Sequence, residues 1–181
     1  MAVSNNESAA EMSVDDRLKA AWSQLTLVLS FFPRIDTKLS VILGLDLGML
    51  AMLSTRLPTY AELQWWHLPL LALCGLPLAL SLYHLYRGAV PDTRGGSDSL
   101  IYFGSVAAIE QESQFIGTTR GRTNQALADD IYGQVWRNSK ILSDKFQGLQ
   151  SAYRYLLLSI VPWLVTLSVL SALSAKTAGH G

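Results

Sequence analysis

The sequence has few of the residues on which most enzymes and metalloproteins depend. Among its 181 residues there is one cysteine, Cys74, and there are three histidines, His67, His84 and His180. A single cysteine excludes an intramolecular disulfide and a cysteine-based metal site. The sequence also contains no serine–histidine–aspartate grouping, no HExxH, no P-loop and no GxGxxG pattern. We therefore expect a chain that is not an enzyme and that binds neither a metal nor a cofactor.

Charged residues are also scarce. They make up 15% of the chain, whereas hydrophobic residues make up 50%, and the mean hydropathy is +0.25. This composition is too apolar for a disordered chain and unusual for a soluble domain. The charged residues, whose net charge is zero, are therefore concentrated in polar regions between long apolar segments.

Three apolar segments, residues 39–57, 67–86 and 155–173, are each long enough to form a transmembrane helix. A helix rises about 1.5 Å per residue, so roughly 20 residues cross a hydrocarbon layer of about 30 Å. The segments are divided two and one by a polar stretch, residues 87–154, in which nothing indicates a β-sheet. The sequence therefore predicts an all-α membrane protein with three transmembrane helices and a helical cytosolic module between the second and third spans.

The basic residues indicate which parts of the chain face the cytoplasm. Eight of the 14 lysines and arginines lie within residues 87–154, and four more precede the first span. Because short segments rich in lysine and arginine stay in the cytoplasm, we expect both regions on that side and residues 174–181 on the outer side. No cleavable signal peptide is evident, so the first span is predicted to anchor a multi-pass protein in the cell inner membrane.

The region before the first span divides into a tail and a helix. Residues 1–12 are small and polar and are predicted to form a flexible tail. Ser13 and Asp16 have the spacing of a helix start, and apolar residues then recur every three or four positions. The pattern predicts an amphipathic cytosolic helix over residues 13–33 that ends at Pro33. Its polar face has few basic residues, which favours packing on the cytosolic module over binding at the membrane surface.

The first span contains two glycines and an acidic residue. Gly44 and Gly48 form a pair of small residues that lets another helix backbone approach closely, which predicts a homo-oligomer. Asp46 lies about 200° around the helix from either glycine and therefore faces a different neighbour. An ionisable group inside a span costs about 2.5 to 3.5 kcal/mol, so it usually faces a partner, water or a pore. A structural hydrogen bond to a serine, threonine or histidine of another span and a functional role remain equal alternatives.

The second and third spans contain prolines and aromatic residues that predict further features. Pro77 and Pro162 each remove one backbone hydrogen bond, so we expect a kink at each position. Tyr153, Tyr155 and Trp163 are predicted to mark the membrane interface where the third span begins.

The cytosolic module is predicted to contain a short helix, a loop and a long helix. Residues 105–115 have the pattern of a short helix, and residues 117–122, which include two glycines and two arginines, are typical of a loop. Asn124 is a good N-cap, and apolar residues follow it at intervals of three and four. One helix is therefore predicted to run from Asn124 into the third span.

The loop before this long helix is the best local candidate for an anion site. Helix N-termini offer free backbone N–H groups and partial positive charge, and arginine side chains match phosphate oxygens. A tyrosine of the module is available to stack on a base. The candidate ligand residues are Arg120, Arg122, Thr123, Arg137, Lys140 and Tyr102. On these residues alone, a solvated basic loop that enforces topology is the favoured alternative.

The order of several short motifs resembles that of a known family. Arg34–Lys38 leads directly into Leu39–Gly44, Leu100–Gly104 follows the second span, and a long helix leads into the last span. This arrangement resembles the transmembrane effectors of Pycsar, the pyrimidine cyclase system of bacterial antiphage defence. The similarity extends from Asp36 to Leu173.

The resemblance implies a signalling function. In that family a phage-activated uridylate or cytidylate cyclase makes a cyclic pyrimidine mononucleotide, and the effector damages the inner membrane, so that the host dies before the phage spreads. The implied ligand is cyclic UMP or cyclic CMP, the implied partners are a cognate cyclase and the lipid bilayer, and no nucleic acid is expected. The alternatives are a membrane scaffold without a ligand and a small channel component that uses Asp46.

Overall fold

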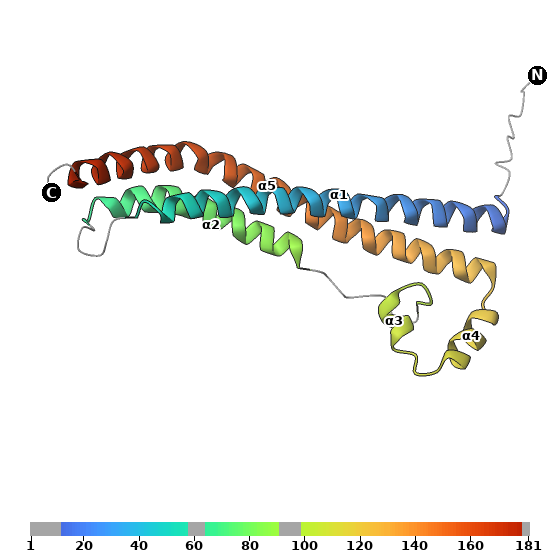
Figure 1. Cartoon of the computed structure of the whole chain (residues 1–181). Coiled ribbons are helices and arrows are strands. Elements are labelled where there is room, and N and C mark those ends of the chain that lie inside the picture. The colour runs from blue at the N-terminus through green and yellow to red at the C-terminus, as the bar shows by residue number, and fades with distance from the viewer. Residues whose placement is uncertain (1–11, 58–63, 91–98, 179–181) are drawn as a thin grey trace, which may run out of the picture. The chain divides into compact units, whose positions relative to one another are not determined.

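The structure, a computed structural model, describes residues 12–57, 64–90 and 99–178. Within these residues the chain forms five helices and no strand (Figure 1). The helices are α1 (Val14–Ser54), α2 (His67–Ala89), α3 (Phe103–Ala107), α4 (Glu112–Arg120) and α5 (Asn124–Ala178). Helices α1, α2 and α5 are long and apolar enough to cross a membrane. These findings confirm the predicted all-α class with three transmembrane helices.

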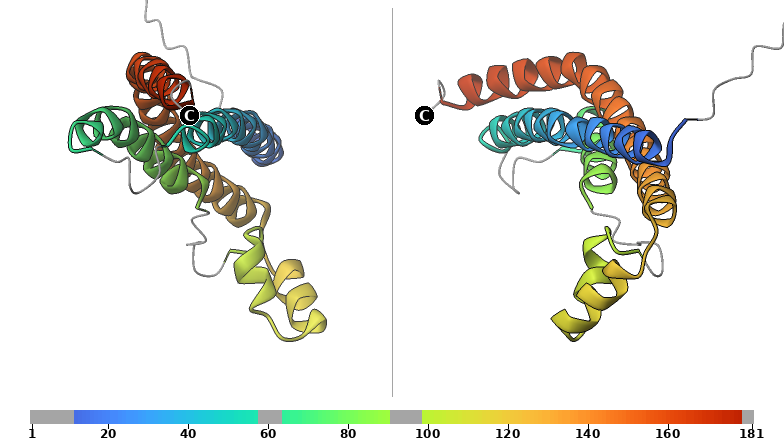
Figure 2. Two further views of the ribbon diagram at one scale, coloured as in Figure 1. Left: turned by 60° about the vertical axis from the view of Figure 1, so that its left-hand side comes forward. Right: turned by 90° about the vertical axis from the view of Figure 1, so that its right-hand side faces the viewer.

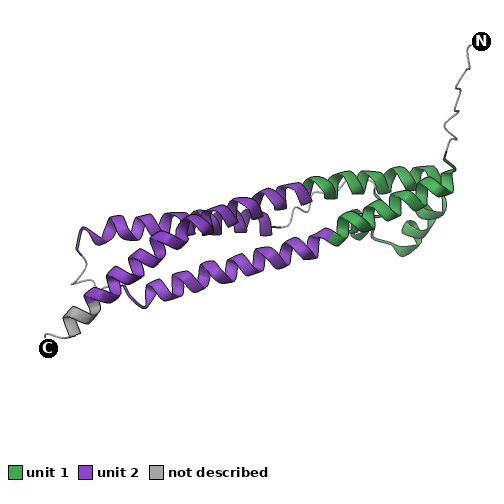
Figure 3. Cartoon of the chain, turned by 90° about the horizontal axis from the view of Figure 1, so that it is seen from above, with its two compact units in different colours: residues 1–30, 93–140 green, residues 31–92, 141–181 purple. Residues whose placement is uncertain are grey.

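The chain divides into two compact units (Figure 3). Unit 1 consists of residues 1–30 and 93–140, and unit 2 consists of residues 31–92 and 141–181. Helices α1 and α5 contribute residues to both units, whereas α2 belongs to unit 2, and α3 and α4 belong to unit 1. Each unit has its own apolar core.

The core of unit 1 is formed by Ala21 and Leu25 of α1 and Ile131 of α5, all of which are buried. The partly buried apolar residues around them are Leu18, Ile101, Leu127, Tyr132 and Val135. Burial of these side chains stabilises the unit in proportion to the apolar area removed from water. The contacts confirm that the apolar face of the predicted N-terminal helix packs on the segment that contains α5.

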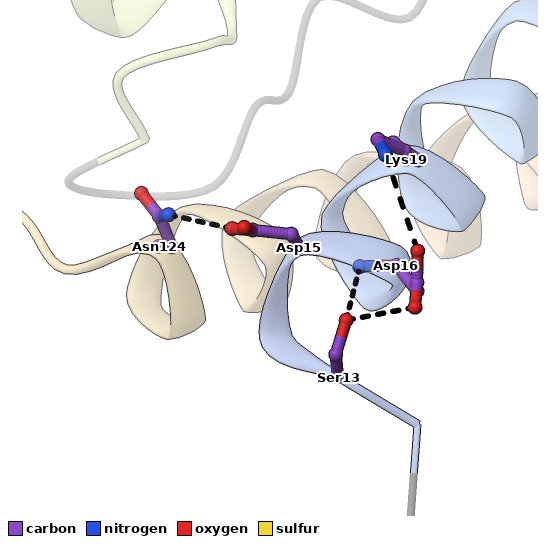
Figure 4. A network of polar contacts seen from close by, with 5 residues as sticks. All are labelled: Ser13, Asp15, Asp16, Lys19 and Asn124. Atoms are coloured by element: carbon purple, nitrogen blue, oxygen red, sulfur yellow. Dashed lines mark hydrogen bonds and ion pairs between the residues drawn. The ribbon is translucent and has the colours of Figure 1, made fainter.

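Side-chain hydrogen bonds fix the beginning of α1. The backbone N–H of Asp16 donates to Ser13 Oγ at 3.2 Å, and this hydroxyl donates to Asp16 Oδ2 at 2.8 Å (Figure 4). The first bond supplies an acceptor to one of the amides that a helix N-terminus leaves without a partner. The predicted helix start at Ser13 is confirmed.

Helix α1 continues through Pro33, so the prediction of a helix end at this residue is wrong. Proline lacks the N–H that would bond to the carbonyl of Leu29, a loss that costs about 3 kcal/mol in a helix interior. Buried residues on both sides offset this loss, with Ala21 and Leu25 before the proline and Ile35 after it. Packing of an apolar face therefore maintains the helix where the local pattern predicts an end.

The segment between α2 and α5 also differs from its prediction. The single helix expected over residues 105–115 is interrupted between α3 and α4, and α4 includes most of the loop expected over residues 117–122. Inside α4 the hydroxyls of Thr118 and Thr119 donate to the carbonyls four residues earlier, at 2.9 and 2.8 Å. These bonds accommodate two threonines in a helix whose composition is typical of a loop.

In unit 2 the helices α1, α2 and α5 lie side by side (Figure 2) and share two buried apolar clusters. The first cluster consists of Ile35, Leu39, Ile42, Leu85, Ala152 and Leu156. The second consists of Leu53, Cys74, Leu78 and Leu170. Helices α2 and α5 remain helical through Pro77 and Pro162, and α5 curves over its orange-to-red part (Figure 2).

Trp163 lies within the packing of unit 2. Its indole N–H donates to the backbone carbonyl of Met49 on α1 at 2.9 Å, and its ring packs against the second cluster. A tryptophan N–H that is removed from water usually finds such an acceptor. Trp163 therefore joins two helices, and its position at the membrane interface stays a prediction.

Candidate functional site

The loop residues predicted to bind an anion lie at the start of α5. Arg120 is the last residue of α4, and Thr123 immediately precedes α5. Thr123 Oγ1 accepts the backbone N–H of Ala126 at 3.2 Å, so Thr123 caps the helix one residue before the predicted cap, Asn124. The cap uses the threonine hydroxyl and one of the N–H groups that the predicted anion would need.

An acidic side chain already lies beside this helix start. The side-chain amide of Asn124 donates to Asp15 Oδ1 at 3.0 Å (Figure 4), and both residues belong to unit 1. A carboxylate near a helix N-terminus interacts favourably with the helix dipole. Asp15 therefore provides part of the negative charge that the sequence analysis assigns to a ligand.

Arg137 and Lys140 lie farther along α5, and Tyr102 immediately precedes α3. Arg137 follows Asn124 by 13 residues, which is about 20 Å along a helix. Lys140 Nζ lies 5.8 Å from the centroid of the Trp136 ring, a distance at which a cation and an aromatic face attract each other. Tyr102 is connected to α5 through Ser99. The backbone N–H of Tyr102 donates to Ser99 Oγ, and the side-chain amide of Gln134 on α5 donates to the same oxygen. Arg137 and Lys140 thus lie apart from the helix start, and ligand binding by the six predicted residues stays a prediction.

Unit 2 contains a polar pocket that the sequence analysis missed. It lies between the end of α2 and the middle of α5 and has a volume of about 350 Å³. The lining residues are His84, Arg87, Gly88, Val90, Ile141, Asp144, Lys145, Gln147, Gly148 and Ser151. Most of these side chains carry a charge or a hydrogen-bonding group, so the pocket is suited to a small polar ligand.

Two glycines determine how closely α2 and α5 approach each other at the pocket. A Cβ atom at Gly148 would lie 3.2 Å from the carbonyl oxygen of His84 and 3.4 Å from Cα of Gly88. A Cβ atom at Gly88 would contact Leu39 of α1 at 3.6 Å. Helices α2 and α5 therefore meet backbone to backbone at these glycines, and the longer side chains on either side of the contact line the polar pocket.

The pocket combines an accessible cation with a nearly buried one. Arg87 is exposed, forms no ion pair with a carboxylate of the described residues, and lies 6.0 Å from the ring centroid of Tyr83. Lys145 is only 13% exposed at its side chain, and its Nζ lies 2.8 Å from Asp36 Oδ1 of α1. An arginine can bind two phosphate oxygens at once, and a lysine adds a point charge, so the pair is suited to an anion.

One feature of the sequence could have indicated this pocket. Lys145 occupies a position in the apolar three-and-four pattern of the long helix, between Leu142 and Leu149. A cation at such a position must have a buried partner or reach a polar cavity. Arg87 gave no comparable signal, because an arginine at the end of a transmembrane segment is common.

Comparison with known families identifies the chain. The sequence profile of the Pycsar effector protein domain matches residues 20–172. The chain belongs to this family. The family places this Pycsar effector in antiphage defence and confirms the resemblance found in the sequence. No curated protein and no solved structure matches the chain.

The acidic residue in the first span of this Pycsar effector forms a hydrogen bond between helices. Asp46 is fully buried, and Ser81 Oγ of α2 donates to its Oδ2 at 2.6 Å. The same hydroxyl lies 3.1 Å from the carbonyl oxygen of Ala152 on α5, so the group connects three helices. The predicted structural hydrogen bond to a neighbouring span is confirmed. Among the described residues Asp46 Oδ1 has no hydrogen-bond partner, and a functional role for this residue stays a prediction.

The two glycines of the first span face away from the described part of the chain. Within the described residues, a Cβ atom added at Gly44 or Gly48 would meet nothing within 4 Å beyond the adjacent helix backbone, and both residues are exposed. Asp46, by contrast, is buried, as its angular position on the helix predicts. In this Pycsar effector the glycine face is therefore available to a helix of another copy, and the homo-oligomer stays a prediction.

Proposed function

We propose that this Pycsar effector senses a cyclic pyrimidine mononucleotide, cyclic UMP or cyclic CMP, and responds by impairing the inner membrane. The family match over residues 20–172 carries the proposal, because it includes all of α2 and most of the other two membrane-crossing helices. The family implies a nucleotide signal that a cognate cyclase makes. The chain itself must then bind the signal and change the membrane.

The polar pocket of unit 2 supports the sensing part of the proposal. It contains an arginine and a lysine for a phosphate group, and an amide and a hydroxyl, from Gln147 and Ser151, for hydrogen bonds to a base or a sugar. The proposed topology, with residues 87–154 in the cytoplasm, would open the pocket to the compartment in which a cyclase acts.

The membrane part of the proposal requires a ligand-dependent change among assembled copies. A ligand shifts an equilibrium only if it binds one arrangement more tightly than another. The exposed Gly44 and Gly48 face offers a contact for a homo-oligomer, and ligand binding would shift the population of its arrangements toward one that admits water or ions. The bilayer is then the target of the response.

Two measurements on the purified full-length protein test the proposal. In nanodiscs, equilibrium dialysis with radiolabelled cyclic UMP and cyclic CMP should show saturable binding of at least one, with cyclic AMP and linear UMP as controls. In dye-loaded liposomes, the same nucleotide should cause leakage. Absence of binding to either cyclic pyrimidine would refute the sensing function, and leakage that is independent of nucleotide would favour a constitutive channel.

A further inference from the structure

Lys145 lies between the polar pocket and helix α1. Its Nζ forms the one ion pair between helices within the described residues of unit 2, at 2.8 Å from Asp36 Oδ1. Lys145 lines the polar pocket and also a second cavity, of about 590 Å³, which Asp36 lines as well. Lys145 therefore borders both cavities, and its ion-pair partner Asp36 lines the second one.

The two partners of this ion pair are buried to very different extents. The side chain of Lys145 is 13% exposed, whereas that of Asp36 is 54% exposed. A nearly buried ammonium group needs an anion, and leaving it unpaired is costly. The carboxylate of Asp36, however, is half exposed and can be hydrated when it is released. An anion inside the polar pocket can therefore replace Asp36 with little loss of stability.

The pocket also provides a second cation for such an anion. Arg87 of α2 lines it together with Lys145 of α5, and the lining contains a single carboxylate, that of Asp144. A cyclic nucleotide monophosphate carries one negative charge on two exocyclic oxygens. One arginine side chain and one ammonium group match this arrangement.

We infer that the pocket between α2 and α5 binds the cyclic phosphate of the messenger through Arg87 and Lys145. We further infer that the phosphate displaces Asp36 and so releases α1 from α5. This inference rests on the proposed sensing function. The released residue lies one turn from Leu39, which is buried in the first apolar cluster of unit 2 and begins the predicted first span. Ligand binding is thereby coupled to the position of a membrane-crossing helix.

The arrangement on α5 also assigns the other parts of the ligand. Asp144, Gln147, Gly148 and Ser151 follow one another at intervals of three, one and three residues and all line the pocket. Side chains at such intervals share one face of a helix. With the phosphate between Arg87 and Lys145, Gln147 and Ser151 are the groups on this face that can bond the polar edge of a pyrimidine.

Three variants test the inference by equilibrium binding of radiolabelled cyclic UMP and cyclic CMP to the full-length protein in nanodiscs. Arg87→Gln and Lys145→Gln should each weaken binding by about ten- to a hundredfold, because each removes a charge-assisted hydrogen bond. Asp36→Asn should strengthen binding by about two- to fivefold, because the ligand no longer competes with a carboxylate. Arg154→Gln, an exposed cation of α5 outside the pocket lining, is the matched control and should keep wild-type affinity.

Hydrogen exchange tests the displacement step in the same samples. Adding the nucleotide to the wild-type protein should accelerate exchange in peptides around Asp36, and Lys145→Gln should show this faster exchange without nucleotide. Slower exchange around Asp36 on ligand binding would overturn the displacement.

The outcomes separate this inference from the function on which it rests. A wild-type protein that binds neither nucleotide overturns both. Binding that is unchanged in Arg87→Gln, Lys145→Gln and Asp36→Asn overturns the pocket assignment alone. Loss of binding on charge reversal of Arg120 and Arg122, with wild-type affinity in Arg87→Gln, would place the ligand in the loop before α5 instead. Asp36→Asn keeps the test decisive if a cation variant fails to fold, because its expected effect is a gain.

Discussion

Replacing Gly148 with alanine should destabilise unit 2, although alanine favours helices. The new Cβ atom would lie 3.2 Å from the His84 carbonyl oxygen and 3.4 Å from Cα of Gly88, and both neighbours are backbone atoms that no rotamer change can move. Overpacking of this kind costs about 1 to 3 kcal/mol, whereas a glycine-to-alanine change in a helix gains roughly 1 kcal/mol. The two terms leave a net destabilisation of about 0 to 2 kcal/mol.

A matched variant isolates the steric term. A Cβ atom at Gly75, in the middle of α2, would meet no atom of another helix within 4 Å in the part of the chain that the structure describes. Gly75→Ala therefore keeps the gain in helix propensity without the clash and should raise the thermal stability or leave it unchanged. The quantity to compare is the difference in Tm between the two variants, with Gly148→Ala the lower.

The chain contains its own reporter for this measurement. Cys74 is the only cysteine of the sequence, and it is fully buried in the second cluster of unit 2. A thiol-reactive fluorogenic dye should therefore label it only when the helices separate, so that labelling during heating gives Tm in detergent without an introduced cysteine. A Gly148→Ala variant whose Tm rises as much as that of Gly75→Ala would refute the close backbone approach of α2 and α5.

Three further predictions concern the other described features. Asp46→Leu should abolish membrane depolarisation in cells that make the nucleotide, and depolarisation at the wild-type rate would restrict Asp46 to a packing role. Asp46→Asn, whose side-chain oxygen can still accept from Ser81, should leave the level of folded protein unchanged. Gly44→Leu should weaken self-association by roughly 1 kcal/mol or more, as measured by crosslinking in membranes. Thr123→Ala should destabilise the first turn of α5 by about 1 kcal/mol and accelerate hydrogen exchange at Ala126, while Thr123→Ser should not.

Features that depend on local chemistry could be predicted from the sequence. Hydropathy and length located the three membrane-crossing helices, and an uninterrupted periodicity predicted that α5 would continue from Asn124 into the last span. The predicted helix end at Pro33 failed because burial of distant neighbours, which a local pattern does not contain, offset the missing hydrogen bond. The chemical type of the Asp46 partner was predicted, but its identity as Ser81 depends on how α2 packs on α1.

The candidate site was less accessible to sequence reasoning than the fold. The polar pocket exists because Gly88 and Gly148, far apart in the chain, allow two helices to meet at their backbones. The residues next to either glycine in the sequence do not indicate that the two glycines are in contact. The arginine loop, by contrast, had a recognisable local pattern, but Thr123 caps α5 there and Asp15 lies beside the helix start.

The bond between Trp163 and Met49 has a consequence for how this protein can change over evolutionary time. The donor is a side-chain N–H that apolar residues lack, whereas the acceptor is a backbone carbonyl that every amino acid supplies. Position 49 can therefore exchange one apolar residue for another and keep the bond, while position 163 loses it with any apolar replacement. A saturation library selected for correctly folded protein should show this one-sided constraint, with a permissive position directly opposite an intolerant one.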